Sequence, residues 1–119
     1  MPQNHLVKHA PGPTELLVVV TSLPSMEVAK GLARSLVERN LAACVQLMDS
    51  VQSIYRWNGK LCEEREVLLS AKTLASKWPE ILSFIQQNHP YDLPEILAFS
   101  PEQYSQQYGE WVQAEVNKA

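Results

Sequence analysis

The residues of this chain with the most chemical potential lie together in one short segment, His89-Pro-Tyr-Asp-Leu-Pro-Glu95. It contains an imidazole, a phenol and two carboxylates, which can bind a metal, transfer protons or hold a small ligand. Its two prolines fix φ and push each preceding residue toward extended backbone. The segment therefore predicts a stiff, polar and aromatic loop. A binding site and a rigid hinge between a helix and a strand are equally good interpretations of it.

Single histidines and cysteines are the other candidates for chemistry. His89 is either a metal ligand or proton-transfer group, or a structural cap at a helix C-terminus, where a cationic imidazole is favoured. Cys44, between apolar neighbours, is either a soft metal ligand or a small buried hydrophobe. Cys62 has polar neighbours and is the better candidate for a reactive thiol. His5 and His9 have helical metal-pair spacing, but they lie in a segment without helical pattern.

Length and composition predict one soluble globular domain. The chain has 119 residues, of which 45% are hydrophobic and 19% charged. Its net charge of -3 and its lack of a Lys/Arg cluster argue against nucleic acid as the main partner. No apolar run approaches the ~20 residues of a membrane span, and no signal peptide is expected. Because two cysteines make no disulfide framework, we expect a reduced, cytoplasmic compartment.

Hydrophobic periodicity divides the chain into a proline-containing tail and a folded domain. Residues 1–13 have no periodicity and predict a disordered tail, followed by a domain over residues 14–119. The expected elements are strand 15–21, helix 25–40, strands 41–48 and 51–57, an Asn58-Gly59 hairpin, strand 61–72, helix 76–88, strand 96–99 and a C-terminal helix opened by a capping box over 100–103.

This element order, β-α-β-β-α-β plus a C-terminal helix, predicts a ferredoxin-like α+β fold. The first two strands and their helix form a crossover unit with parallel strands, and Asp49-Ser50 can be a bulge within one bent strand. Two helices would cover one face of the antiparallel sheet. The other face would expose Tyr55, Trp57 and further apolar residues, and a large exposed apolar face indicates a subunit interface.

Several short segments between Glu15 and Trp111 match one protein family in their order along the chain. They are 41–45, 53–59, 66–68, 72–73, 89–91, 94–96, Tyr108 and Trp111. Through these segments the chain resembles the CutA family of divalent-cation tolerance proteins. This resemblance implies a ferredoxin-like protomer in a compact homotrimer, with no established enzymatic reaction. It also implies a relation to copper and an architecture similar to that of P-II signalling proteins, which bind small effectors between subunits.

The resemblance places the family's copper ligands at Thr21, Asn88 and His89, and only His89 keeps a metal-binding side chain. One imidazole without a soft thiolate holds copper weakly. We therefore expect a non-enzymatic trimer associated with divalent-metal tolerance that binds copper or another divalent ion weakly. No nucleophile–base pair, phosphate loop or metal-ligand spacing predicts catalysis.

The alternative is a P-II-like module that holds a small anionic ligand in a cleft between subunits. Lys72, Tyr91 and Glu95 are the candidates for lining this cleft, although a structural ion pair beside a packed tyrosine at a subunit junction is the slightly better explanation of them. Tyr55 and Trp57 are better explained as trimer-interface packing than as a stacking platform. A scaffold trimer that binds proteins through its outer helices is a third possibility.

Overall fold

The computed structural model describes residues 11–118. The predictions for residues 1–10, including the metal pair His5 and His9, lie outside the described residues. At the start of the described part, the carbonyl of Pro13 accepts a hydrogen bond of 3.0 Å from the Ser76 amide. Within these residues, no helix has both the length and the apolar character needed to cross a membrane.

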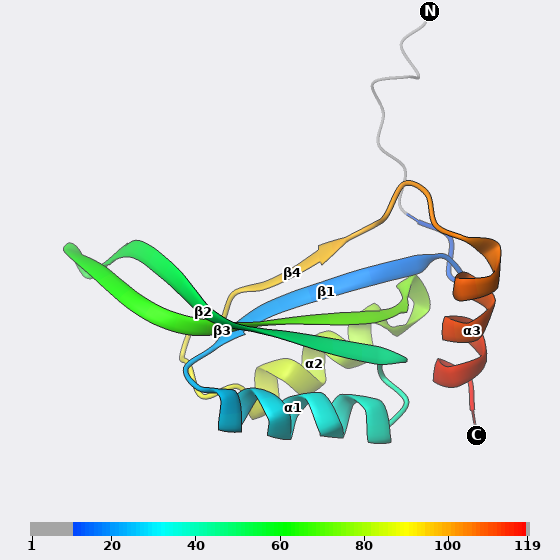
Figure 1. The fold of residues 1–119 in the computed structure, drawn as a ribbon, viewed down its shortest axis with the longest axis horizontal. Coiled ribbons are helices and arrows are strands. Elements are labelled where there is room, and N and C mark those ends of the chain that lie inside the picture. The colour runs from blue at the N-terminus through cyan, green and yellow to red at the C-terminus, as the bar shows by residue number, and fades with distance from the viewer. Residues whose placement is uncertain (1–10, 119) are drawn as a thin grey trace, which may run out of the picture.

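A four-stranded antiparallel sheet forms the centre of the protein (Figure 1). Its strands are β1 (Leu16–Leu23), β2 (Cys44–Trp57), β3 (Lys60–Leu74) and β4 (Ile96–Phe99), in the order β2-β3-β1-β4. The helices are α1 (Met26–Glu38), α2 (Trp78–Asn88), which follows the 3-10 turn η2 (Ala75–Lys77), and α3 (Gln106–Val116). This order and topology confirm the predicted ferredoxin-like α+β arrangement. In it β1 and β2 are parallel to each other, and β3 lies between them and is antiparallel to both.

Helix α1 begins and ends at residues whose chemistry favours those positions. The Ser25 hydroxyl accepts a hydrogen bond from the Val28 amide and so caps the first turn. At the other end, Asn40 has a φ of 58°, and the amides of Asn40 and Leu41 donate to Val37 and Leu36 carbonyls. This is a Schellman motif, which satisfies the last carbonyls and turns the chain into β2.

The predicted bulge at Asp49-Ser50 is confirmed. β2 is one long strand, its register against β3 shifts between Met48 and Val51, and Ser50 has a φ of 63°. The hairpin prediction is also confirmed, because Asn58 and Gly59 have φ values of 52° and 78°, as a type I′ turn requires. Beyond the bulge, the β2–β3 hairpin projects from the body of the protein (Figure 1).

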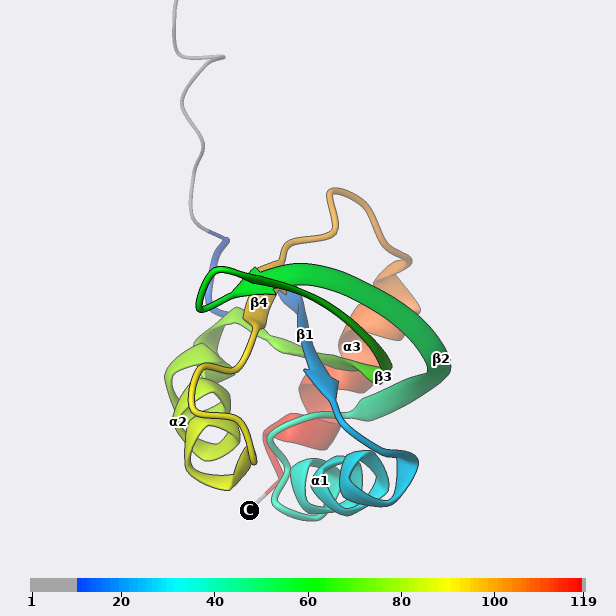
Figure 2. The same ribbon diagram turned by 90° about the vertical axis from the view of Figure 1, so that its left-hand side faces the viewer.

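The two faces of the sheet are covered differently. Helices α1 and α2 lie on one face (Figures 1 and 2), where they bury the main core around Val19, Leu69 and Ile85. On the other face, Val112 and Val116 of α3 pack on the ends of β1 and β3. The rest of this second face exposes apolar side chains, among them Met48, Leu97 and Phe99. The second face of the protomer is therefore apolar and exposed as predicted, but it is only partly bare, because α3 covers one end of it.

The predicted start of the C-terminal helix at Ser100–Gln103 is wrong. α3 begins later, with Ser105 as its N-cap, whose hydroxyl accepts from the Tyr108 amide at 3.2 Å. Tyr104 explains the difference, because its hydroxyl accepts a hydrogen bond from the Leu16 amide at 3.3 Å and ties the preceding residues to β1. A tertiary contact thus overrides a local capping signal.

Candidate functional site

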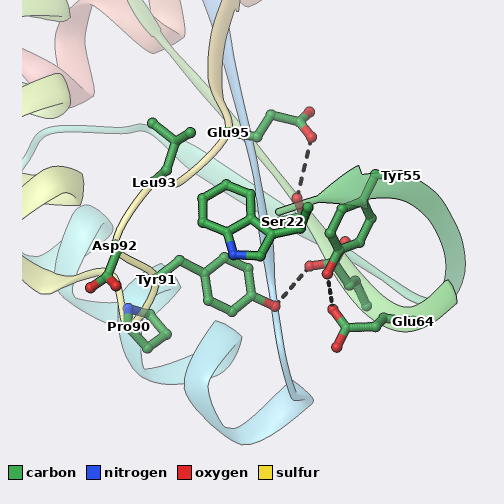
Figure 3. A pocket seen from close by; sticks show the side chains of 10 residues that line it. Ser22, Tyr55, Glu64, Pro90, Tyr91, Asp92, Leu93 and Glu95 are labelled. Atoms are coloured by element: carbon green, nitrogen blue, oxygen red, sulfur yellow. Dashed lines mark hydrogen bonds between the residues drawn. The ribbon is translucent and has the colours of Figure 1, made fainter. Parts of the chain in front are cut away.

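A pocket of about 520 Å³ lies between the β2–β3 hairpin and the loop that joins α2 to β4 (Figure 3). Ser22 contributes from the end of β1, and alternation along the strands places the pocket on the sheet face opposite α1 and α2. The lining residues are Ser22, Tyr55, Trp57, Glu64, Glu66, Pro90, Tyr91, Asp92, Leu93 and Glu95.

Tyr91 and Glu66 form the most buried interaction of the pocket. The Tyr91 hydroxyl donates a hydrogen bond of 2.7 Å to Oε2 of Glu66. Glu66 is only 7% exposed. Burial, followed by this hydrogen bond to a carboxylate, raises the pKa of Tyr91 above its usual range. The phenol therefore stays protonated and keeps donating to Glu66.

Tyr55 and Glu64 form a second tyrosine–carboxylate pair on the hairpin. The Tyr55 hydroxyl donates to Oε1 of Glu64, and this hydrogen bond is the main reason why the pKa of Tyr55 rises to about 12. Unlike Tyr91, Tyr55 is exposed, as is Trp57. The two aromatic side chains can therefore contact a ligand or a second subunit directly.

His89 anchors the loop that carries Tyr91. Its Nε2 lies 2.8 Å from the Ser22 carbonyl oxygen, and its Nδ1 accepts a hydrogen bond of 3.1 Å from the Tyr91 amide. Since Nδ1 accepts, the proton belongs on Nε2, which donates to Ser22. Both ring nitrogens of this buried residue are therefore engaged, and a metal could bind only after one of these bonds breaks.

The other residues placed by resemblance at the copper positions are also engaged or enclosed. Thr21 is fully buried in β1, and the Asn88 amide donates to the Phe84 carbonyl at 2.8 Å. Cys44 lies half-buried opposite Lys72, at the start of β2. In residues 11–118, no group of three or more His, Cys, Asp or Glu side chains is arranged to hold a metal ion. The metal role of His89 and Cys44 stays a prediction.

Within one protomer, the structure separates the three residues predicted to line a ligand cleft. Tyr91 and Glu95 line the pocket, and the Ser22 hydroxyl lies 3.4 Å from Oε1 of Glu95. Lys72 does not line it, and its ammonium group donates to Gln46 instead.

The pocket carries acidic groups without a matching cation. Four carboxylates line it, from Glu64, Glu66, Asp92 and Glu95, and no Lys or Arg is among the lining residues. The ion pairs found in the described part of the chain lie elsewhere, at Lys77–Glu80 and Lys118–Glu115. Within the protomer the site therefore suits a cation better than the small anionic ligand of the alternative prediction.

Ser22, Glu64 and Glu66 were missed as site residues. A signal for two of them was present, because the register puts Glu64 and Glu66 on the same face of the hairpin as Tyr55 and Trp57. Applying this two-residue period across the Asn58-Gly59 turn would have found both carboxylates. Nothing local indicated Ser22, which meets the loop only through the fold.

The topology and this pocket define a ferredoxin-like α+β protein with an acidic, aromatic site beside its hairpin. Residues 17–115 match the family described as CutA1 divalent ion tolerance protein, and the chain belongs to this family. The divalent-cation tolerance protein CutA of Thermus thermophilus is 40% identical over 95 residues, covering 80% of this chain and 92% of the relative. Protein CutA of Homo sapiens is 40% identical over 100 residues, and the match spans 84% of this chain but only 56% of the human protein.

Solved structures of the family share the fold. The divalent cation tolerance protein of Thermus thermophilus superposes with a TM-score of 0.81 at 38% identity, covering 84% of this chain and 97% of that chain. CutA from Synechococcus elongatus superposes with a TM-score of 0.84 at 34% identity, covering 87% and 92%. The comparisons thus assign the protein to the CutA family along nearly all of its described domain.

Proposed function

We propose that this protein contributes to cellular tolerance of divalent metal ions, copper in particular, as a non-catalytic homotrimer in the cytoplasm. The observation that carries the proposal is the family match over residues 17–115, together with a relative at 40% identity that is named for divalent-cation tolerance. Growth of cells that lack the gene, in graded copper, tests it. Restored growth on re-expression supports the role, and equal copper sensitivity with and without the gene contradicts it.

The trimer is supported by two features of the protomer. The second sheet face exposes Met48, Leu97 and Phe99, and β2 and β4 are edge strands with free backbone groups. Association of three copies could bury these apolar side chains and pair the backbone groups of the edge strands. Light scattering should give three times the chain mass of 13.4 kDa. A monomer or dimer at micromolar concentration would contradict the trimer.

We further propose that direct metal binding is weak. Of the three positions implied by family resemblance, Thr21 and Asn88 have no imidazole or thiolate, and both nitrogens of His89 are hydrogen-bonded. Calorimetry with Cu(II) and Cu(I) on tag-free protein measures the affinity. Tight binding by the parent protein would refute weak binding, and unchanged binding by His89→Ala would remove His89 from the site.

The second candidate function is a P-II-like module that holds a small anionic ligand in a cleft between subunits, where another copy would contribute Lys72. The pocket of one protomer is acidic, and Lys72 lies outside it. A thermal-shift screen of the native oligomer with nucleotides and small carboxylates tests this function. A ligand at a hundredfold its Kd should add about 2.7 kcal/mol of stability, and this increase should be lost in Lys72→Ala. No stabilisation by any compound of the screen would count against the module.

A further inference from the structure

The pocket beside the hairpin contains a largely buried glutamate, and no lysine or arginine is among the residues that line the pocket. Glu66 is 7% exposed, and the hydrogen bond found for its carboxylate in the described residues is the one from Tyr91 to Oε2. A carboxylate is costly to remove from water unless a cation and hydrogen bonds replace its hydration. One phenol leaves Oε1 and the negative charge of Glu66 available to a cationic group in the pocket.

Three aromatic side chains line the same pocket as Glu66. Tyr55, Trp57 and Tyr91 all line the same pocket, and Figure 3 shows Tyr55 and Tyr91 facing it from opposite sides. The face of an aromatic ring attracts a cation through its quadrupole, and tryptophan does so most strongly. Aromatic walls combined with carboxylates are the chemistry that recognises an ammonium group with attached carbon.

We propose that this pocket binds a small organic cation that carries a primary or methylated ammonium group. The ammonium group would lie near Glu66 between the aromatic rings, and the remaining carboxylates would accept hydrogen bonds from further polar groups of the ligand. A volume of about 520 Å³ lies within the range of small-molecule sites, roughly 300–1,000 Å³. The inference goes beyond metal tolerance, because it needs neither copper nor His89.

A metal ion is a poorer match for the same pocket. Hard divalent cations need several oxygen ligands converging within about 2.6 Å of one point. In residues 11–118 no three potential ligands converge in this way, and the Glu66 and Glu64 carboxylates are each bound to a tyrosine hydroxyl. Aromatic walls also contribute nothing to metal coordination, whereas they favour an organic cation.

The test uses the native oligomer and two probes of the same shape. Choline carries a methylated ammonium group, and 3,3-dimethylbutan-1-ol replaces its charged nitrogen by carbon. Calorimetry or saturation-transfer NMR should show saturable binding of choline or of the primary diamine 1,5-diaminopentane. The neutral alcohol should bind at least about tenfold more weakly, because it lacks the charge that Glu66 and the rings attract.

Variants separate this site from non-specific attraction to an acidic protein. Glu66→Gln should weaken binding of the cation about tenfold or more, whereas Glu63→Gln should leave it unchanged. Glu63 lies on the same strand, is exposed and does not line the pocket, so it is a matched control for the lost charge. If Glu66→Gln fails to fold, Trp57→Leu replaces it, since Trp57 is 47% exposed and lines the site.

Several outcomes would overturn the proposal. One is that neither choline nor 1,5-diaminopentane binds at concentrations up to about 10 mM. A pocket filled by a lysine of a second copy would give this result, and the proposal would then be wrong. Equal affinity for choline and its neutral analogue is another. A third is binding that Glu66→Gln and Trp57→Leu leave unaltered. Displacement of choline by equimolar Mg²⁺ or Cu²⁺ would also overturn the proposal, because it would show that the pocket prefers a metal ion to an organic cation.

Discussion

The His89 ring at the end of α2 lies 2.8 Å from the carbonyl oxygen of Ser22 in β1, although 67 residues separate them. This hydrogen bond joins the last turn of the second helix to the strand at the centre of the sheet. The other ring nitrogen of His89, Nδ1, accepts a hydrogen bond from the Tyr91 amide, so the same side chain fixes the start of the loop. Two prolines stiffen that loop, and His89 determines where it sits relative to β1.

Replacing His89 with alanine should therefore destabilise the protein. The variant leaves the Ser22 carbonyl and the Tyr91 amide without their partner, and a buried unsatisfied group costs about 1–3 kcal/mol. Urea unfolding of the native oligomer at fixed concentration measures the loss. Asn88→Ala is the control, because Asn88 is exposed and makes one local bond, so its effect should be well below that of His89→Ala. Equal effects would contradict the anchoring role.

Tyr91→Phe should destabilise the protein more than Tyr55→Phe. The first variant leaves the buried Glu66 carboxylate without its phenol donor, at an expected cost of about 1–3 kcal/mol. The second variant removes a hydrogen bond to Glu64 on the exposed hairpin, where water replaces the donor. Denaturant unfolding compares the two. If Tyr55→Phe costs as much as Tyr91→Phe, burial is not the deciding factor.

Alkaline titration should detect the raised tyrosine pKa values. The pKa of Tyr55 rises from 10.0 to about 12, and the pKa values of Tyr91 and Tyr108 are also raised. Because these values are higher in the folded state, the folded protein holds its phenolic protons more tightly. Their stabilising contribution is fully present below pH 10, declines as the unfolded chain ionises, and is lost as the pH rises through the folded pKa.

Ultraviolet absorbance of tyrosinate measures this titration directly. Native protein should show an ionisation near pH 12 that is missing in Tyr55→Phe, whereas protein unfolded in urea should titrate near the ordinary value of 10. The main cause is the Glu64 hydrogen bond, so Glu64→Gln should lower the pKa of Tyr55 toward the ordinary value. A Tyr55 ionisation near pH 10 in native protein would contradict the hydrogen bond.

Replacing a buried threonine with valine should stabilise the protein. The hydroxyl oxygens of Thr21 and Thr73 are buried, and neither has a hydrogen-bond partner within residues 11–118. Because valine keeps the shape and removes the unsatisfied hydroxyl, Thr21→Val should raise the free energy of unfolding by about 1 kcal/mol. Ser25→Ala, which removes the α1 cap, should lower it by about 1 kcal/mol in the same assay. Destabilisation by Thr21→Val would reveal a partner for the hydroxyl.

Elements that depend on local sequence signals were predicted, whereas features that depend on contacts between distant residues were not. The continuous apolar run of β1, the periodic faces of α1 and α2, and the Asn58-Gly59 turn are local signals, and each predicted its element. The α3 boundary was wrong because Tyr104 bonds to Leu16, 88 residues earlier. No local pattern contains a contact of that range.

The candidate site divides in the same way. Tyr91 and Glu95 were predicted because they lie in one chemically distinctive loop, and both line the pocket. Lys72 was grouped with them by its strand position, but a predicted strand end does not say which loop it meets. The strand period places Glu66 on the face of the pocket, but its burial could not be predicted, because the burial comes from the packing of the 89–95 loop over the hairpin. That packing depends on the His89–Ser22 bond between distant segments.

Gly109 gives a final prediction in which helix propensity and packing oppose each other. A Cβ at this position of α3 would lie 2.7 Å from Cε2 of the Tyr104 ring, much closer than two carbons can approach. Glycine in a helix costs about 1 kcal/mol relative to alanine. Its presence here is explained by the Tyr104 ring, which lies against the helix while its hydroxyl holds the Leu16 amide.

Gly109→Ala alone should therefore destabilise the protein, because the displaced Tyr104 ring loses its bond to Leu16. In a Tyr104→Ala background the clash is gone, and Gly109→Ala should then stabilise the protein by up to about 1 kcal/mol through helix propensity. A double-mutant cycle of unfolding free energies measures this change of sign. The same effect of Gly109→Ala in both backgrounds would show that the ring moves away at no cost. A sign change would establish the Tyr104–Gly109 contact as the reason that glycine occupies this helix.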